Sequence, residues 1–83
     1  MKAVRDVLRQ MLQELHPDVD VDAEQNLASD GILDSFDIAS LVARIRADLD
    51  VKVPPEKIIP EHFQSLETIS KMVETLGGGV SHR

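Results

Sequence analysis

The 83-residue sequence has no cysteine, tryptophan or tyrosine, and its only aromatic residues are Phe36 and Phe63. The absence of cysteine excludes disulfide bonds and cysteine metal sites, so any thiol chemistry would need a thiol from outside the chain. Because aromatic side chains are so few, we expect a core built from Leu, Ile, Val and Met.

Basic residues are outnumbered: nine Lys and Arg stand against fifteen Asp and Glu, which gives a net charge of −6. Such an excess of negative charge disfavours binding to a nucleic-acid backbone and favours partners with basic surfaces. No apolar run approaches the ~20 residues of a membrane span, and the N-terminal MKAVRD has no signal-peptide core. We therefore expect no nucleic-acid partner, no membrane span and a cytoplasmic location.

The length of the chain suits one small domain. A chain of this size buries only about 60% of the surface that its unfolded form exposes, so every amphipathic segment has to contribute to the core. We expect a single domain over residues 1–83, with an ordered core at about residues 2–77 and a frayed tail at residues 78–83 that follows three consecutive glycines.

Two stretches near the ends of the chain have the apolar spacing of amphipathic helices. In residues 2–15 the apolar side chains recur at intervals of three and four, and Pro17 should end this helix at about residue 15 or 16. Towards the C-terminus, Ser65 can cap a helix whose apolar stripe continues to Leu76, and the glycines at 77–79 should end it.

A third amphipathic helix is expected at residues 35–49. Its core face should consist of Ile38, Leu41, Val42, Ile45 and Leu49. The opposite face is small and uncharged, and it includes Phe36, Ser40, Ala43 and Ala47. An uncharged outer face suits the docking of a partner, whereas the alternative is that Phe36 folds back over the preceding turn and the alanines reflect helix propensity.

The long connection between the first two helices contains an acidic run at residues 18–24. Its D-x-D-x-D spacing matches the first ligand positions of an EF-hand calcium loop. However, Ala23 stands where the sharp turn needs glycine, and Ser29 stands where the bidentate carboxylate belongs. We therefore expect no metal site and a solvated loop, whose contributions to the core would be Val19, Val21 and Leu27.

Prolines mark the second connection. Residues 50–55 are expected to form a loop. The sequence Pro60-Glu61-His62-Phe63 predicts a single helical turn with proline first and Phe63 pointing inward. Ile58 and Ile59 are further candidates for the core. Three long helices and one short helix together predict an all-α fold, a small four-helix bundle.

The stretch D-G-I-L-D-S-F-D at residues 30–37 precedes and opens the second helix. Gly31 can supply the positive φ of a tight turn, and Asp34 with Asp37 reads as a variant capping box. Ser35 should then lie exposed in the first helical turn, where the helix dipole favours an anion on its oxygen by roughly 0.3–1 kcal/mol. No histidine or lysine lies nearby in sequence to act as a base, so the pattern indicates a modified serine.

This stretch resembles the phosphopantetheine attachment region of acyl, peptidyl and D-alanyl carrier proteins. The order of elements from about Val4 to Leu76 is also similar to that of the carrier fold. It runs through a long helix, a long loop, the helix that begins with the serine, a short turn and a long helix. The resemblance implies that a phosphopantetheinyl transferase, using coenzyme A and Mg²⁺, attaches 4′-phosphopantetheine to Ser35. The thiol of this arm would carry acyl or aminoacyl groups as thioesters, so the protein would be a carrier and not an enzyme.

The same resemblance assigns roles to neighbouring residues. Asp34 would cap the helix and take part in recognition by the transferase, and Phe36 would be a contact beside the arm. The helix at residues 35–49 corresponds to the main docking surface of the family. We expect its docking residues to be Phe36, Ala39, Ser40, Ala43, Arg44, Arg46 and Ala47. The expected partners are the transferase, a loading ligase or acyltransferase and downstream enzymes, with the carrier itself a monomer.

Two departures from fatty-acid carriers bear on the pathway. Phe36 follows the serine where those carriers usually have leucine, and Arg44 and Arg46 lie on a helix that is strongly acidic in them. A change of charge at a docking surface alters partner choice more than fold. The resemblance therefore favours a specialised pathway over general fatty-acid synthesis, and it leaves the cargo open.

Two rival functions can be built on this sequence. A serine hydrolase built on Ser35 needs a base and an oxyanion hole, and the histidines at 16, 62 and 82 lie in or near loops and the tail. We expect His16 to be partly exposed near the end of the first helix, and His62 to be a surface residue. An unmodified adaptor would use the face of Phe36, Ala43 and Ala47 to bind a partner. An adaptor would still bind its partner after Ser35→Ala, whereas a carrier would lose its modification.

Overall fold

A computed structural model of the protein describes residues 3–77, which form three α-helices and two short 3-10 helices without any strand. The α-helices are α1 (Val4–Leu15), α2 (Ser35–Leu49) and α3 (Leu66–Thr75), and the 3-10 helices are η1 (Pro55–Lys57) and η2 (Pro60–Phe63). The all-α prediction is confirmed. The predicted count of four helices is not, because η1 is a second short element that was not predicted and both η elements are single turns. The expected tail at residues 78–83, with His82, lies outside the described residues.

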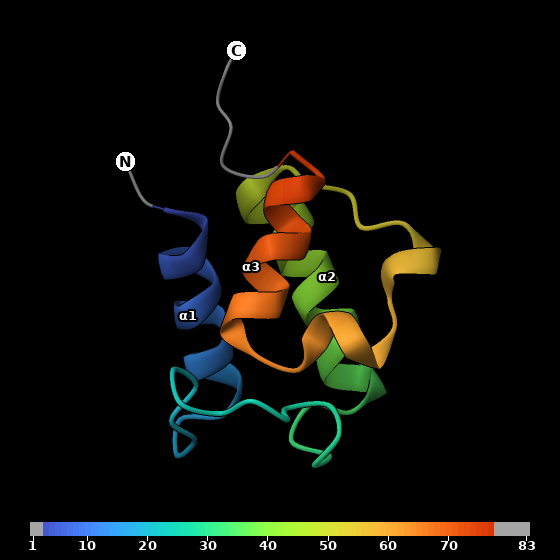
Figure 1. The fold of residues 1–83 in the computed structure, drawn as a ribbon. Coiled ribbons are helices and arrows are strands. Elements are labelled where there is room, and N and C mark those ends of the chain that lie inside the picture. The colour runs from blue at the N-terminus through green and yellow to red at the C-terminus, as the bar shows by residue number, and fades with distance from the viewer. Residues whose placement is uncertain (1–2, 78–83) are drawn as a thin grey trace.

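α1 packs against both of the other α-helices, as Figure 1 shows. The long connection between α1 and α2 crosses one end of the three helices, and the η1–η2 segment lies beside α2 and α3. No helix within residues 3–77 has the length and apolar character needed to cross a bilayer.

The first helix ends where the sequence predicted. Its last turn closes with the His16 N–H donating to the Leu12 carbonyl oxygen at 2.9 Å, just before Pro17. Its apolar stripe faces the core, and the buried residues are Val4, Leu8, Met11 and Leu12.

The start of α3 is fixed by a reciprocal capping box that extends the predicted Ser65 cap. The Thr68 N–H donates to Ser65 Oγ at 3.1 Å, and the Ser65 N–H donates to Thr68 Oγ1 at 3.0 Å. Two otherwise unpaired backbone donors are thereby satisfied. The helix buries the predicted stripe, here Leu66, Ile69, Met72 and Val73, and Gly77 follows it with φ +104°.

Phe63 lies fully buried, as predicted from the short turn at residues 60–63. Two valines of the segment after α2, Val51 and Val53, are also buried and were not predicted, although their alternation with Lys52 is the pattern of a chain with one buried side. The prediction that Ile58 and Ile59 belong to the core is wrong. They remain 39% and 38% exposed, because the segment between the two 3-10 turns runs along the surface.

The long connection is held against α1 by polar contacts. Arg9 Nε donates to Asp22 Oδ1 at 2.9 Å, and this hydrogen bond raises the pKa of Arg9 above its ordinary value. The Asp22 carboxylate, one of the three in the D-x-D-x-D run, is therefore held by an arginine. Within residues 3–77 no three acidic or histidine side chains gather as a metal site requires. The apolar residues of the connection reach the core as expected, with Val21 and Leu27 buried and Val19 packed against it.

Candidate functional site

The first turn of α2 is set by a tight turn and a helix cap. Gly31 adopts φ +77°, and its N–H donates to the Ala28 carbonyl oxygen at 3.1 Å. Asp34 is extended, and its Oδ1 accepts the Asp37 N–H at 2.8 Å. The helix therefore begins at Ser35, as predicted, and Ser35 is exposed.

Only half of the predicted capping box forms at this helix. The Asp37 carboxylate does not bond back to the Asp34 N–H among the described contacts. Instead, its Oδ2 lies 2.9 Å from Nε2 of His16, at the end of α1. His16 is 28% exposed, in agreement with the predicted partly exposed histidine, but its contact with a residue 21 positions away was not predicted.

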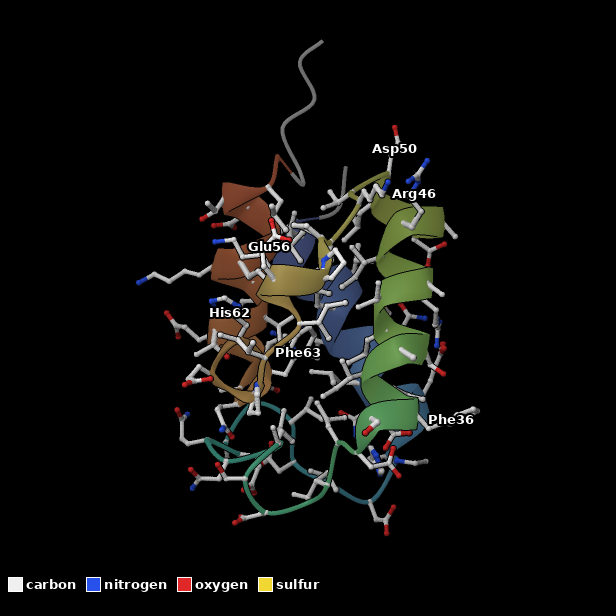
Figure 2. All side chains as sticks on the ribbon, turned by 90° about the vertical axis from the view of Figure 1, so that its right-hand side faces the viewer. Phe36, Arg46, Asp50, Glu56, His62 and Phe63 are labelled. Carbon is white, nitrogen blue, oxygen red and sulfur yellow. The ribbon has the colours of Figure 1, made fainter. Side chains whose placement is uncertain are left out.

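Phe36 projects away from the bundle beside the serine. Its side chain is 77% exposed and points outward from the first turn of α2, as Figure 2 shows. The alternative in which Phe36 folds back over the preceding turn is therefore wrong. The aromatic ring is therefore accessible from solvent beside Ser35.

The other predicted docking residues are distributed along α2. Ala39, Ala43, Arg46 and Ala47 are exposed, and Ser40 and Arg44 are half-buried. The Arg44 guanidinium donates to the Glu14 carboxylate of α1, so its charge is already paired. Arg46 makes no ion pair with any residue in 3–77, and it lies near the end of α2 opposite Phe36 (Figure 2).

A groove of about 400 Å³ runs beside Ser35, between α2 and the segment that joins η1 to η2. One side consists of Ser35 and apolar residues of α2, and the other consists of the exposed isoleucines; the lining residues are Ser35, Ile38, Ala39, Val42, Ile58, Ile59 and Pro60. The sequence signal for this groove was the pair Ile58-Ile59, which is apolar but lies between Lys57 and Pro60. Apolar character alone did not distinguish a core residue from a groove residue.

Within residues 3–77, Ser35 Oγ has no hydrogen bond to a base. The His16 ring contacts Asp37. The His62 Nδ1 lies 2.8 Å from the Lys57 carbonyl oxygen, which can only accept, so Nδ1 carries the hydrogen. A hydroxyl without a neighbouring base is a poor nucleophile by itself, and it requires a base from a partner protein to react.

Comparison with known proteins agrees with this geometry. The family model described as phosphopantetheine attachment site matches residues 2–76. Aminoacyl carrier protein 1 of Bradyrhizobium diazoefficiens is 39% identical over 56 residues, which cover 68% of this chain and 61% of that protein. Aminoacyl carrier protein 2 of the same organism is 32% identical over 77 residues, or 92% of this chain and 85% of that protein. No solved structure matches the chain.

The family match bears on the rival functions. Carrier proteins of this family are modified by phosphopantetheinyl transferases, interact with the enzymes they serve and are not enzymes themselves. A hydrolase built on Ser35 is therefore excluded, and an unmodified adaptor is not favoured. Because the family model covers residues 2–76 and two carrier proteins align with two thirds or more of the chain, this protein belongs to the acyl carrier protein family, whose domain is the site for covalent attachment of 4′-phosphopantetheine.

Proposed function

We propose that Ser35 is the residue to which 4′-phosphopantetheine is attached. The observation that carries this proposal is the exposure of Ser35 in the first turn of α2, immediately after the Asp34 cap. Unpaired backbone N–H groups and the positive end of the helix dipole favour the negative charge that a phosphodiester brings to this hydroxyl. Exposure lets the active site of another enzyme reach it.

The surroundings of Ser35 fit the arm. The groove beside it is mostly apolar, and the aliphatic part of the arm could lie against Ile38 and Val42 of α2 and against Ile58 and Ile59 opposite. When bound, phosphopantetheine supplies a thiol that carries cargo as a thioester, which this cysteine-free chain cannot provide.

In the attachment reaction, the Ser35 hydroxyl takes the phosphopantetheinyl group from coenzyme A, and adenosine 3′,5′-bisphosphate leaves. No base within residues 3–77 hydrogen-bonds Ser35 Oγ, so the transferase has to accept the proton. Asp34 holds the start of the helix during this encounter through its bond to the Asp37 N–H, and we propose that it is also part of the surface that the transferase recognises.

We propose that the cargo is aminoacyl and that the pathway is specialised, because both similar proteins are named aminoacyl carrier proteins. The charge pattern of α2 supports partners other than those of fatty-acid carriers. Phe36 provides the exposed aromatic anchor, and Arg46 is an exposed cation for an acidic group of a partner. The proposed docking surface comprises Phe36, Ala39, Ser40, Ala43, Arg44, Arg46 and Ala47.

We also propose an oligomeric state and a compartment for the protein. It acts as a single monomeric carrier domain in the cytoplasm, where coenzyme A and the transferase would meet it. Analytical ultracentrifugation of the modified protein tests the monomer, and fractionation of cells tests the compartment.

The attachment residue is tested by intact mass spectrometry. The protein is incubated with coenzyme A, Mg²⁺ and a broad-specificity phosphopantetheinyl transferase beside two variants, Ser35→Ala and Ser70→Ala. Wild type and Ser70→Ala should each gain one phosphopantetheinyl group, because Ser70 is buried in α3, and Ser35→Ala should gain none. A folded Ser35→Ala that is still modified would place the attachment elsewhere.

The cargo is tested on protein purified from cells that make it. Hydroxylamine cleaves a thioester to a hydroxamate, so an aminoacyl hydroxamate should be released and identified by mass spectrometry. Release of a fatty acyl hydroxamate instead would contradict the aminoacyl proposal while leaving the carrier function in place.

A further inference from the structure

Gln64, at the junction of η2 and α3, makes three hydrogen bonds to the loop that leads to Ser35. Its backbone carbonyl oxygen accepts the Leu27 N–H at 2.8 Å. Its side-chain Oε1 accepts the Ser29 N–H at 3.0 Å, and its Nε2 donates to Ser29 Oγ at 2.7 Å. Both functional atoms of the amide are thus directed at one residue 35 positions earlier in the chain.

Gln64 itself is held on both sides. Phe63 before it is fully buried, and Ser65 after it is buried within the capping box of α3. These neighbours anchor the backbone at residue 64 to the core. The loop is therefore attached to a segment that is anchored in the core.

From Leu27 the bonds continue to the start of α2. The Leu27 carbonyl oxygen accepts the Leu33 N–H at 2.9 Å, which closes residues 27–33 into a compact turn, and both leucine side chains are buried. Leu33 directly precedes Asp34, the cap of the helix that begins at Ser35. The Gln64 contacts thereby bear on the direction in which the chain enters α2.

We infer that Gln64 is a positioning residue for the modification of Ser35, an inference that rests on the proposed function of Ser35. It holds the loop at residues 27–33 so that Asp34 and Ser35 meet the transferase in one geometry. Group transfer between two proteins requires the acceptor oxygen to be aligned, and a displacement of ~1 Å in such a geometry can cost roughly 100-fold in rate.

The experiment measures kcat/KM for transfer of phosphopantetheine from coenzyme A by one transferase, well below the Tm of every variant. Gln64→Ala should lose about tenfold, a fraction of the full misalignment cost. Gln64→Glu should retain the wild-type value, because a carboxylate accepts the Ser29 N–H and, after rotation of the hydroxyl, the Ser29 O–H as well. If the wild type is a substrate and Gln64→Ala has the same kcat/KM as the wild type, the inference is overturned.

Ser29→Ala and the double variant Ser29→Ala/Gln64→Ala separate positioning from direct contact with the transferase. If Gln64 acts through Ser29, the double variant is no slower than Gln64→Ala alone. Multiplied losses in the double variant, or a loss in Gln64→Glu as large as that in Gln64→Ala, would show that Gln64 acts by touching the transferase and would overturn the inference.

Val4→Ala serves as a control for lost stability. Val4 is buried in the first turn of α1, whereas the long connection begins after the last turn of that helix. At a comparable loss of Tm, Val4→Ala should keep the wild-type kcat/KM; an equal loss of rate would make the Gln64 effect one of stability and overturn the inference. A wild type that gains no phosphopantetheine overturns the proposed function of Ser35 and this inference with it.

Discussion

His16 Nε2 and Asp37 Oδ2 lie 2.9 Å apart and join the end of α1 to the first turn of α2. The two side chains are 28% and 19% exposed, so the contact is largely shielded from water. It places a link between two helices within two residues of Ser35. It also explains why Asp37 does not complete the capping box, since its carboxylate is used by another helix.

Removal of this contact should destabilise the fold. We expect His16→Ala to lower the free energy of unfolding by about 0.5–1.5 kcal/mol, the usual value of one hydrogen bond. Asp37→Ala should cost somewhat more, because a carboxylate in the first helical turn also adds about 0.3–1 kcal/mol through the helix dipole. Urea denaturation of the two single variants and the double variant measures the coupling. Strictly additive losses would mean that the two side chains do not interact in solution.

The two roles of Asp34 can be separated by substitution. Asp34→Ala removes the acceptor for the Asp37 N–H and should destabilise the protein by about 1 kcal/mol. Asp34→Ser keeps a capping oxygen but no charge, so it should preserve most of the stability. If the transferase recognises the carboxylate, Asp34→Ser should still lower kcat/KM for modification of Ser35. Retention of the full rate by Asp34→Ser would limit Asp34 to capping.

Phe36 should matter for partners and not for stability. Because its side chain is 77% exposed, Phe36→Ala should change the free energy of unfolding by no more than about 0.5 kcal/mol. Loss of an exposed aromatic anchor should raise the KM of the transferase for the carrier, and Phe36→Leu should recover part of it. The comparison is made by urea denaturation and by transferase kinetics on the same preparations. An unchanged KM in Phe36→Ala would remove Phe36 from the docking surface.

The end of α2 contains backbone strain that substitution can relieve. Asp50 caps this helix with φ +57°, a conformation that costs a residue with a side chain more than glycine. Asp50→Gly should therefore stabilise the protein by about 0.5–1 kcal/mol. Asp48→Gly, two residues earlier and inside the helix, provides the matched control and should destabilise it by about 0.5–1 kcal/mol. Thermal unfolding of both variants measures the difference, and a loss of stability in Asp50→Gly would contradict the assignment of strain.

Local features of the chain were predictable because their causes lie within a few residues. The start of α2 at Ser35 follows from the Asp34 side chain three residues before the N–H that it accepts. The inward side chain of Phe63 follows from a proline-initiated turn, and the cap of α3 follows from Ser65. Helical periodicity and capping are properties of neighbouring residues, so no knowledge of the partner segments is needed.

The sequence by itself therefore determined the α-helices, the buried stripes of α1 and α3 and the exposed serine at the start of α2. Of the predicted core face of α2, only Leu41 and Ile45 are fully buried. Only the tertiary structure decided which polar groups meet across the chain, such as His16 with Asp37 and Gln64 with Ser29. It also decided that Ile58 and Ile59 line a groove beside Ser35. The physical reason is that a side chain carries its polarity in the sequence, whereas the partner that satisfies it depends on how distant segments are brought together in the fold.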